Sequence, residues 1–221
     1  IYHEQFASVI GRGFFPEKIL VYGPYWKRVL ENGCEYHSPA IHVAGDYLFR
    51  LNQSKLNTVP KENIVLICAQ KNLHDDYIGY AKILMTHMQK YPDWRLVLKL
   101  HPQEKNKEAY YLLTELGVDI RDIDTPLDLL LKSCRIHISI YSTTFYDALG
   151  FDVCNFSLQH YGTMSDYAAD MISESVALPL YVNEDPIEKF RALGTATLGL
   201  APRSDVYSEF DEKAISIAIG L

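Results

Sequence analysis

RLVLKLHP (residues 95–102) and IHISIYSTTFYDALG (residues 136–150) are the two stretches of the sequence that decide the fold. Each begins with an apolar run of strand length, ends at side chains that can bind an anion, and is expected to lead into a helix. Two junctions of this kind predict strands whose loops open at one edge of a sheet.

Apolar runs of strand length alternate with stretches of helical period along most of the chain. The run IVLICA at 64–69 is apolar throughout, which is typical of a parallel strand covered on both faces. The expected strands are 64–69, 95–100, 118–123, 136–140, 153–158 and 178–182. The expected helices are 75–90, 106–116, 126–133, 143–149 and 186–193, the first with an apolar stripe of Ile78, Ala81, Ile83, Leu84 and Met88. This alternation predicts an α/β fold: a Rossmann-like parallel sheet with helices on both faces.

The pattern divides the chain into three parts. Residues 1–50 contain a strand–helix–strand unit, residues 51–63 are a polar, aperiodic linker, and residues 64–221 form one domain. Because the first residue is Ile rather than Met, we expect that a longer protein contains this chain.

Composition excludes several classes of protein. The 221 residues are 48% hydrophobic and carry a net charge of −7, which argues against broad binding to nucleic acid. No apolar run reaches the length of about 18 residues that a membrane span needs. The four cysteines form no CxxC pair, so we expect reduced, buried thiols rather than a metal or disulfide site.

Hydroxyl side chains occupy the expected start of the helix after the second junction. Tyr141, Ser142, Thr143 and Thr144 lie where backbone N–H groups are unsatisfied, which suits a phosphate or diphosphate. The alternative is a simple N-cap formed by Ser142 or Thr143.

Three other groups of residues are candidates for the same edge of the sheet. His101 can donate to a phosphate oxygen or carry positive charge beside one, with Pro102 fixing its loop; otherwise it is a surface residue in a tight turn. The hydroxyl-bearing residues 141–144 are called the hydroxyl loop. Asp147 lies one helical turn after it and can accept from ribose hydroxyls, or is a solvated helix residue. Gln70 and Lys71 follow the 64–69 strand and can contact a base or a phosphate, or form an ordinary exposed loop.

Several well-known site motifs are absent from the sequence. There is no GxGxxG, no GxxxxGK[ST], no HExxH and no GxSxG, which disfavours classical NAD binding, P-loop chemistry, zinc proteolysis and α/β-hydrolase chemistry. No histidines show metal-ligand spacing. We expect His137, on a central strand, to be a hydrogen-bonded core residue.

The combination of a strand ending in KLHP (99–102) with a strand followed by STTFYDALG (142–150) resembles the C-terminal half of the GT-B glycosyltransferases. It is most similar to the bacterial envelope group: capsular polysaccharide transferases, polysialyltransferase-like enzymes and CDP-glycerol glycerophosphotransferases. The segment FPEKILVYG (15–23) and the residues up to 45 also resemble the end of the N-terminal half of such enzymes.

The resemblance implies a function in surface polysaccharide biosynthesis. His101, Ser142 and Thr143 would grip the phosphates of a CMP-, CDP- or UDP-linked donor, Asp147 would hold its ribose, and the enzyme would transfer a sugar or glycerophosphate without a metal or other cofactor. His101 would stabilise the leaving phosphate electrostatically. The saccharide acceptor and the catalytic base would come from an N-terminal domain that is largely missing here, so this chain would lack the full active site. The resemblance further implies a cytoplasmic protein, with the full-length chain associated peripherally with the inner face of the membrane.

Two other functions remain open from the residues. One is an isomerase similar to UDP-N-acetylglucosamine 2-epimerase, which shares the architecture and a histidine-bearing loop. The other is a non-catalytic module that binds a nucleotide sugar. Fold analogy alone does not choose between them.

Overall fold

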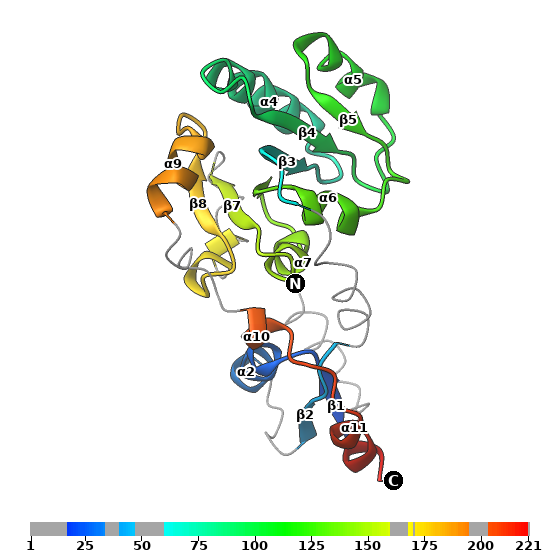
Figure 1. Cartoon of the computed structure of the whole chain (residues 1–221). Helices are drawn as coiled ribbons and strands as arrows, with labels where there is room; N and C mark the ends of the chain where they lie inside the picture. Colours follow the sequence, from blue (N-terminus) through cyan, green and yellow to red (C-terminus); the bar gives the residue numbers. More distant parts are fainter. Residues whose placement is uncertain are drawn as a thin grey trace. The chain divides into compact units, whose positions relative to one another are not determined.

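The computed structural model describes residues 17–33, 40–46, 60–159, 168–169, 171–194 and 203–220. They divide into two compact units (Figure 1). The small unit contains residues 17–46 together with 203–220, and the sheet unit contains residues 60–194.

The sheet unit is built on six parallel strands, which confirms the predicted fold class. The strands are β3 (Ile64–Cys68), β4 (Arg95–Lys99), β5 (Asp119–Arg121), β6 (Ile136–Ser139), β7 (Cys154–Gln159) and β8 (Leu178–Tyr181). They lie in the order β5-β4-β3-β6-β7-β8. Every residue of β3 is buried, as its unbroken apolar run predicts for a central strand covered on both sides.

Helices cover both faces of this sheet (Figure 1). One core cluster joins the sheet to α4 (His74–Met88), α5 (Lys107–Tyr111) and α9 (Pro186–Leu193). The other joins it to α6 (Leu127–Ser133) and α7 (Thr144–Leu149). The helix predicted over 106–116 is divided into α5 and the 3-10 turn η2 (Thr114–Leu116), which ends at Gly117 with a φ of 87°.

The buried stripe of α4 differs from the predicted one. Tyr77 and Tyr80 are buried, whereas Ile83 is 39% exposed and Ile78 is only partly buried. A tyrosine ring buries a large apolar area. The Tyr77 hydroxyl donates to Gln70 Oε1, whereas no described residue bonds the buried Tyr80 hydroxyl. The predicted stripe contains no tyrosine, and it therefore lies about one residue further round the helix than the buried stripe.

The small unit has a parallel pair of strands, β1 (Ile19–Val21) and β2 (Ile41–Val43), joined through α2 (Pro24–Gly33). The helices α10 (Arg203–Val206) and α11 (Glu212–Ile219) belong to the same unit. Ser208 N donates to Tyr22 O at 2.9 Å, and Asp211 N donates to Ala44 O at 2.9 Å.

The predicted domain limits therefore need two corrections. Residues 203–220 pack with the small unit rather than with the domain predicted over 64–221, because their backbone donors bond the ends of β1 and β2. Residues 60–63 of the predicted linker 51–63 belong to the sheet unit, since Lys61 Nζ donates to the carbonyls of Leu131 and Cys134 at 2.9 Å each. Residues 51–59 lie outside the described residues.

Gly45, just after β2, is a position where residues 203–220 pack closely on the backbone. It has a φ of 75°, and a Cβ on it would collide with the backbone carbonyl of Glu209. We expect Gly45→Ala to destabilise the small unit by about 2 kcal/mol, from the positive φ and the displaced backbone. The measurement is hydrogen exchange of the Ser208 and Asp211 amides, which should speed up by about 30-fold.

Gly79→Ala on α4 is the matched control for this substitution. A Cβ on Gly79 meets nothing within 4 Å, so the change should leave the small unit unaffected. Equal exchange rates in Gly45→Ala and the wild type would contradict the close packing of the C-terminal segment.

Two further properties concern the described residues. Cys68, Cys134 and Cys154 are buried free thiols, as predicted, and Cys34 lies outside the described residues. None of the described helices is both long and apolar enough to pass through a membrane.

Candidate functional site

The candidate site lies at the carboxyl edge of the sheet, where the strand order reverses. From β3 the chain runs outward through β4 and β5, then returns to the other side of β3 and continues through β6, β7 and β8. Ligands of open α/β sheets bind outside the carboxyl ends of the strands at such a switch point. Here the switch point is flanked by residues 70–73 after β3 and 141–143 after β6.

Gln70 joins these two loops. Its Nε2 donates to Tyr141 O, and its Oε1 accepts from Tyr141 N at 3.0 Å. The Tyr77 hydroxyl donates to the same Oε1 at 2.9 Å and lies 3.1 Å from Ser139 Oγ. The Gln70 amide is thus engaged by the protein itself. These contacts position the Tyr141 loop, and the base or phosphate contact predicted for Gln70 stays a prediction.

His101 follows β4 and has one ring nitrogen occupied. Gln103 N donates to His101 Nδ1 at 3.0 Å, so Nδ1 is an acceptor and the proton of the neutral ring lies on Nε2. Burial lowers the pKa of His101; the Glu104 carboxylate opposes this change, and the nearby Lys71 and Lys99 ammonium groups add to it. His101 therefore offers a neutral N–H donor, and the alternative of a standing positive charge is disfavoured.

Two buried charged residues hold the ends of β4 and its loop in place, and the sequence reading missed both. Lys99 Nζ donates to Asp122 O at 3.2 Å and to Ile123 O at 3.1 Å, and burial lowers its pKa. The Glu104 carboxylate accepts from Asn106 N at 2.8 Å and from the Tyr110 hydroxyl at 3.4 Å. Lys99 lies at the end of an otherwise apolar strand, and this position in the sequence could have indicated that it is buried. These contacts fix the loop that carries His101.

The hydroxyl loop after β6 presents two open backbone donors. Thr144 N donates to Ser142 Oγ at 3.3 Å, a local turn contact, whereas the N-cap residue of α7 is Thr143, whose side chain makes no capping hydrogen bond. Among the described residues, none accepts from Ser142 N or Thr143 N, and Thr143 is exposed. Because α7 has only six residues, its dipole adds little, and the N–H groups and hydroxyls are what this loop offers to an anion.

A buried polar chain lies beneath this loop. Thr144 Oγ1 is 3.1 Å from His137 Nε2, and His137 Nδ1 is 2.9 Å from Asn155 Oδ1. His137 is 0% exposed, and desolvation lowers its pKa to about 4 despite the hydrogen bond to Asn155. His137 is thus the hydrogen-bonded core residue that the sequence predicted.

The remaining predicted residues lie around the same edge. Lys71 and Pro102 are exposed in the loops after β3 and β4. Asp147 is exposed on α7, and a contact of its carboxylate with a ribose stays a prediction. Within the described part of the chain, no three His, Cys, Asp or Glu side chains group to hold a metal ion, and metal-free chemistry stays a prediction.

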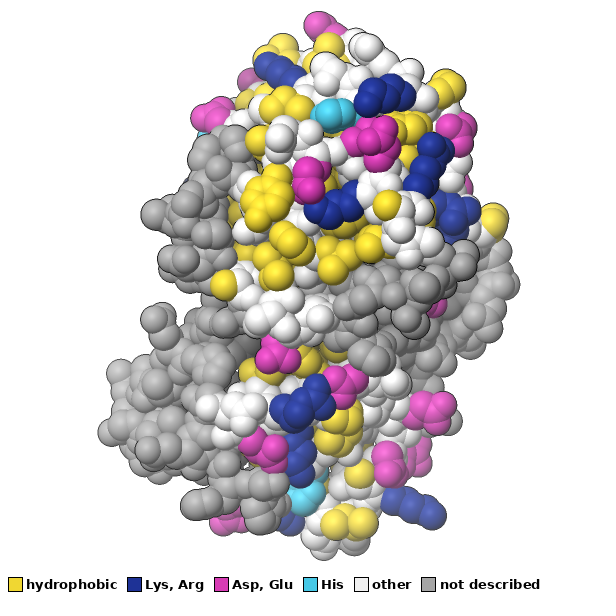
Figure 2. Space-filling model, turned by 90° about the vertical axis from the view of Figure 1, so that its left-hand side faces the viewer, with side chains coloured by type: hydrophobic (Ala, Val, Ile, Leu, Met, Phe, Trp, Pro, Cys, Tyr) yellow, Lys and Arg dark blue, Asp and Glu magenta, His cyan; other side chains and the backbone are white. Residues whose placement is uncertain are grey.

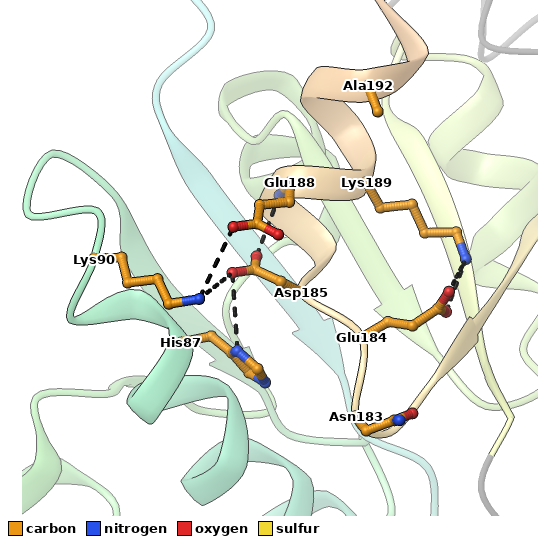
Figure 3. Close-up of a pocket in the computed structure, with 8 residues that line it drawn as sticks. All are labelled: His87, Lys90, Asn183, Glu184, Asp185, Glu188, Lys189 and Ala192. Carbon is orange, nitrogen blue, oxygen red and sulfur yellow. Dashed lines mark hydrogen bonds and ion pairs between the residues drawn. The ribbon is translucent and has the colours of Figure 1, made fainter.

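A separate surface hollow of about 520 Å³ lies between the end of α4 and the start of α9 (Figure 3). Its lining includes Lys90 and Lys189 as cations and Glu184, Asp185 and Glu188 as carboxylates. Asp185 caps α9 by accepting from Ile187 N at 2.9 Å, and Lys189 pairs with Glu184 at 2.7 Å. Figure 2 likewise shows both signs of charge interspersed over a face of the sheet unit. With three carboxylates against two cations, mostly paired, this hollow does not suit a phosphate ligand.

Comparison with known proteins identifies the fold. No family model matches the chain, and no curated protein matches it in sequence. Among solved structures it is similar to UDP-GlcNAc 2-epimerase of Methanocaldococcus jannaschii in complex with UDP-GlcNAc and UDP, with a TM-score of 0.57, 11% identity, and coverage of 93% of this chain and 61% of that one.

Two glycosyl-transferring or polymerising enzymes are similar to a comparable degree. A variant of the wall teichoic acid polymerase TagF has a TM-score of 0.52 and 15% identity over 92% of this chain and 56% of that one. The spinosyn rhamnosyltransferase SpnG has a TM-score of 0.53 and 17% identity over 75% of this chain and 46% of that one. The chain thus spans about half to three fifths of these proteins. At such identities the likeness shows the fold, a Rossmann-like domain of GT-B type.

Proposed function

We propose that this chain binds the nucleotide part of an activated donor at the carboxyl edge of the sheet and belongs to an enzyme that transfers a sugar or a glycerophosphate. The observation that carries the proposal is a pair of donor groups that flank the switch point and from which no described residue accepts. These are His101 Nε2–H after β4 and the backbone N–H groups of Ser142 and Thr143 after β6.

The spacing of the two groups supports a shared ligand. The registers place His101 level with Gln70, and Gln70 level with Tyr141, so the two loops are two strand spacings apart. That is about 10 Å, which leaves room for phosphate oxygens within reach of both loops. Asp147, exposed on α7 after this loop, would accept from the ribose hydroxyls. Lys71 would add positive charge at the rim.

The chemistry of such a site is electrostatic. Fixed N–H donors stabilise the charge that develops on the leaving phosphate, and they need no reorganisation as the bond breaks. His101 would act in this way as a neutral hydrogen-bond donor. The catalytic base and the saccharide acceptor would be supplied by residues outside the described part of the chain.

The biological setting is part of the same proposal. The resemblance of the KLHP and STTFYDALG motifs to bacterial envelope enzymes supports surface polysaccharide biosynthesis with a CMP-, CDP- or UDP-linked donor. The likeness to a wall teichoic acid polymerase agrees with it. The full-length protein would then work in the cytoplasm at the inner face of the membrane.

Calorimetry of the whole chain with CMP, CDP and UDP tests the nucleotide site. We expect saturable binding of at least one of the three at one site per chain, because open N–H donors favour phosphate oxygens. The matched control is His87→Ala in the surface hollow, which should bind as the wild type does. Absence of binding for all three nucleotides would contradict the proposal.

An epimerase function is the second candidate, favoured by the TM-score of 0.57 to UDP-GlcNAc 2-epimerase. Incubation with UDP-N-acetylglucosamine and no acceptor separates the two. An epimeric product supports the isomerase, whereas transfer that requires an added acceptor supports the transferase. Nucleotide binding with neither reaction would support a non-catalytic module.

A further inference from the structure

His137 is a buried histidine that touches no open surface but contacts the hydroxyl loop from below. It is 0% exposed on β6, and its ring packs edge-on against Phe145 with centroids 5.3 Å apart. Both ring nitrogens are engaged, Nδ1 at 2.9 Å from Asn155 Oδ1 and Nε2 at 3.1 Å from Thr144 Oγ1. A buried imidazole requires partners for both nitrogens, and here one partner is Asn155 on β7 and the other is Thr144 at the start of α7.

The direction of these hydrogen bonds follows from Asn155. Its Nδ2 donates to Phe145 O at 2.8 Å and to Val176 O at 3.1 Å, which fixes the orientation of the amide. Oδ1 therefore faces His137 and must accept from Nδ1–H. The neutral ring then has its lone pair on Nε2, and the Thr144 hydroxyl must donate to it.

Thr144 connects the buried His137 to Ser142 in the hydroxyl loop. Thr144 Oγ1 lies 2.9 Å from Ser142 Oγ, and Thr144 N donates to the same Oγ at 3.3 Å. Thr144 is the donor to Ser142 Oγ, so its single hydroxyl proton is shared between Ser142 Oγ and His137 Nε2. These two contacts hold the Ser142 side chain against Thr144, at the start of α7.

We propose that His137 is a positioning residue for the donor phosphates: acting through Thr144, it holds Ser142 and the two open backbone N–H groups in the orientation that binds an anion. The proposal rests on the proposed function, since it concerns the same loop. Groups that orient binding residues without touching the ligand commonly change affinity by about tenfold when removed. Phosphate affinity would then depend on His137, although the ligand does not contact it.

Nucleotide affinity of four variants tests this role, with whichever of CMP, CDP and UDP the wild type binds. His137→Leu and Thr144→Val should each weaken binding by about tenfold, and the double variant should bind like Thr144→Val within about twofold, because both changes break one path. His137→Gln, whose amide can donate to Asn155 and accept from Thr144, should recover most of the affinity. Ile136→Val, a buried substitution on the same strand, should bind as the wild type does.

The outcomes separate the two proposals. The positioning role alone would be overturned if His137→Leu bound the nucleotide as tightly as the wild type does. It would also be overturned if the fold-losses of the two single variants multiplied in the double variant. A wild type that binds none of the nucleotides would overturn the proposed function and this inference with it. If His137→Leu does not fold, the nucleotide affinities of His137→Gln and Thr144→Val are compared instead. A His137→Gln affinity as low as that of Thr144→Val would overturn the positioning role.

Discussion

Between pH 6.5 and pH 4, the wild-type sheet unit should lose about 3 kcal/mol more unfolding free energy than the His137→Gln variant. In the folded state, desolvation holds the pKa of His137 at about 4, whereas in the unfolded chain it is about 6.5. As pH falls through this window, the unfolded state takes up a proton that the folded state does not. Stability is therefore lost as pH falls, and the loss from this group levels off below pH 4.

The comparison of two proteins isolates this one group. Carboxylates and the other histidines also titrate in this range, but they are shared by the wild type and the variant and cancel in the difference. Urea unfolding followed by Trp94 fluorescence, with both proteins carrying Trp26→Phe, reports the sheet unit alone. If the unfolding free energies of the wild type and of His137→Gln changed with pH in parallel, His137 would be hydrated or charged in the folded protein.

His101→Ala is expected to weaken nucleotide binding by roughly 30-fold, about 2 kcal/mol, the free energy of one hydrogen bond to a charged group. The substitution removes the Nε2–H donor at the end of β4 and leaves the hydroxyl loop intact. Calorimetry with the nucleotide that the wild type binds is the measurement. His87→Ala provides the histidine control on the same unit, and unchanged affinity in His101→Ala would place the phosphates elsewhere.

The pH dependence of this affinity tests the charge state of His101. A neutral donor with a lowered pKa predicts that diphosphate affinity does not fall as pH rises from 6.5 to 8. A cationic histidine would lose its proton over this range, and the affinity would fall with it. The first outcome agrees with the hydrogen bond that Nδ1 accepts from Gln103 N.

The sheet was predictable because its signal is local. The apolar run of β3 and the alternation of strands with helices need only neighbouring residues, and the strands fall within one or two residues of their predicted bounds. The place of α10 and α11 was not predictable in this way. Their partners are the ends of β1 and β2, which no periodicity in the C-terminal segment reveals.

The site was predicted as a set of residues rather than as an arrangement. The positions of His101, Ser142 and Thr143 follow from strand ends and loop chemistry. That Gln70 would bond the backbone of Tyr141, 71 residues later, depends on two strands becoming neighbours. The same holds for the tautomer of His101, which is set by one backbone N–H. Sequence reading finds groups capable of binding, and tertiary structure decides which are already occupied.

The interleaving of the two units along the chain has a consequence for folding order. The Arg28–Asp205 ion pair closes a separation of 177 residues, and the whole sheet unit lies inside that interval. Closing so long a loop through an unfolded chain costs more conformational entropy than closing it once the intervening residues are compact. Contacts of residues 203–220 with the rest of the small unit should therefore form after the sheet unit has collapsed, and the amides of residues 203–220 should gain protection later during refolding.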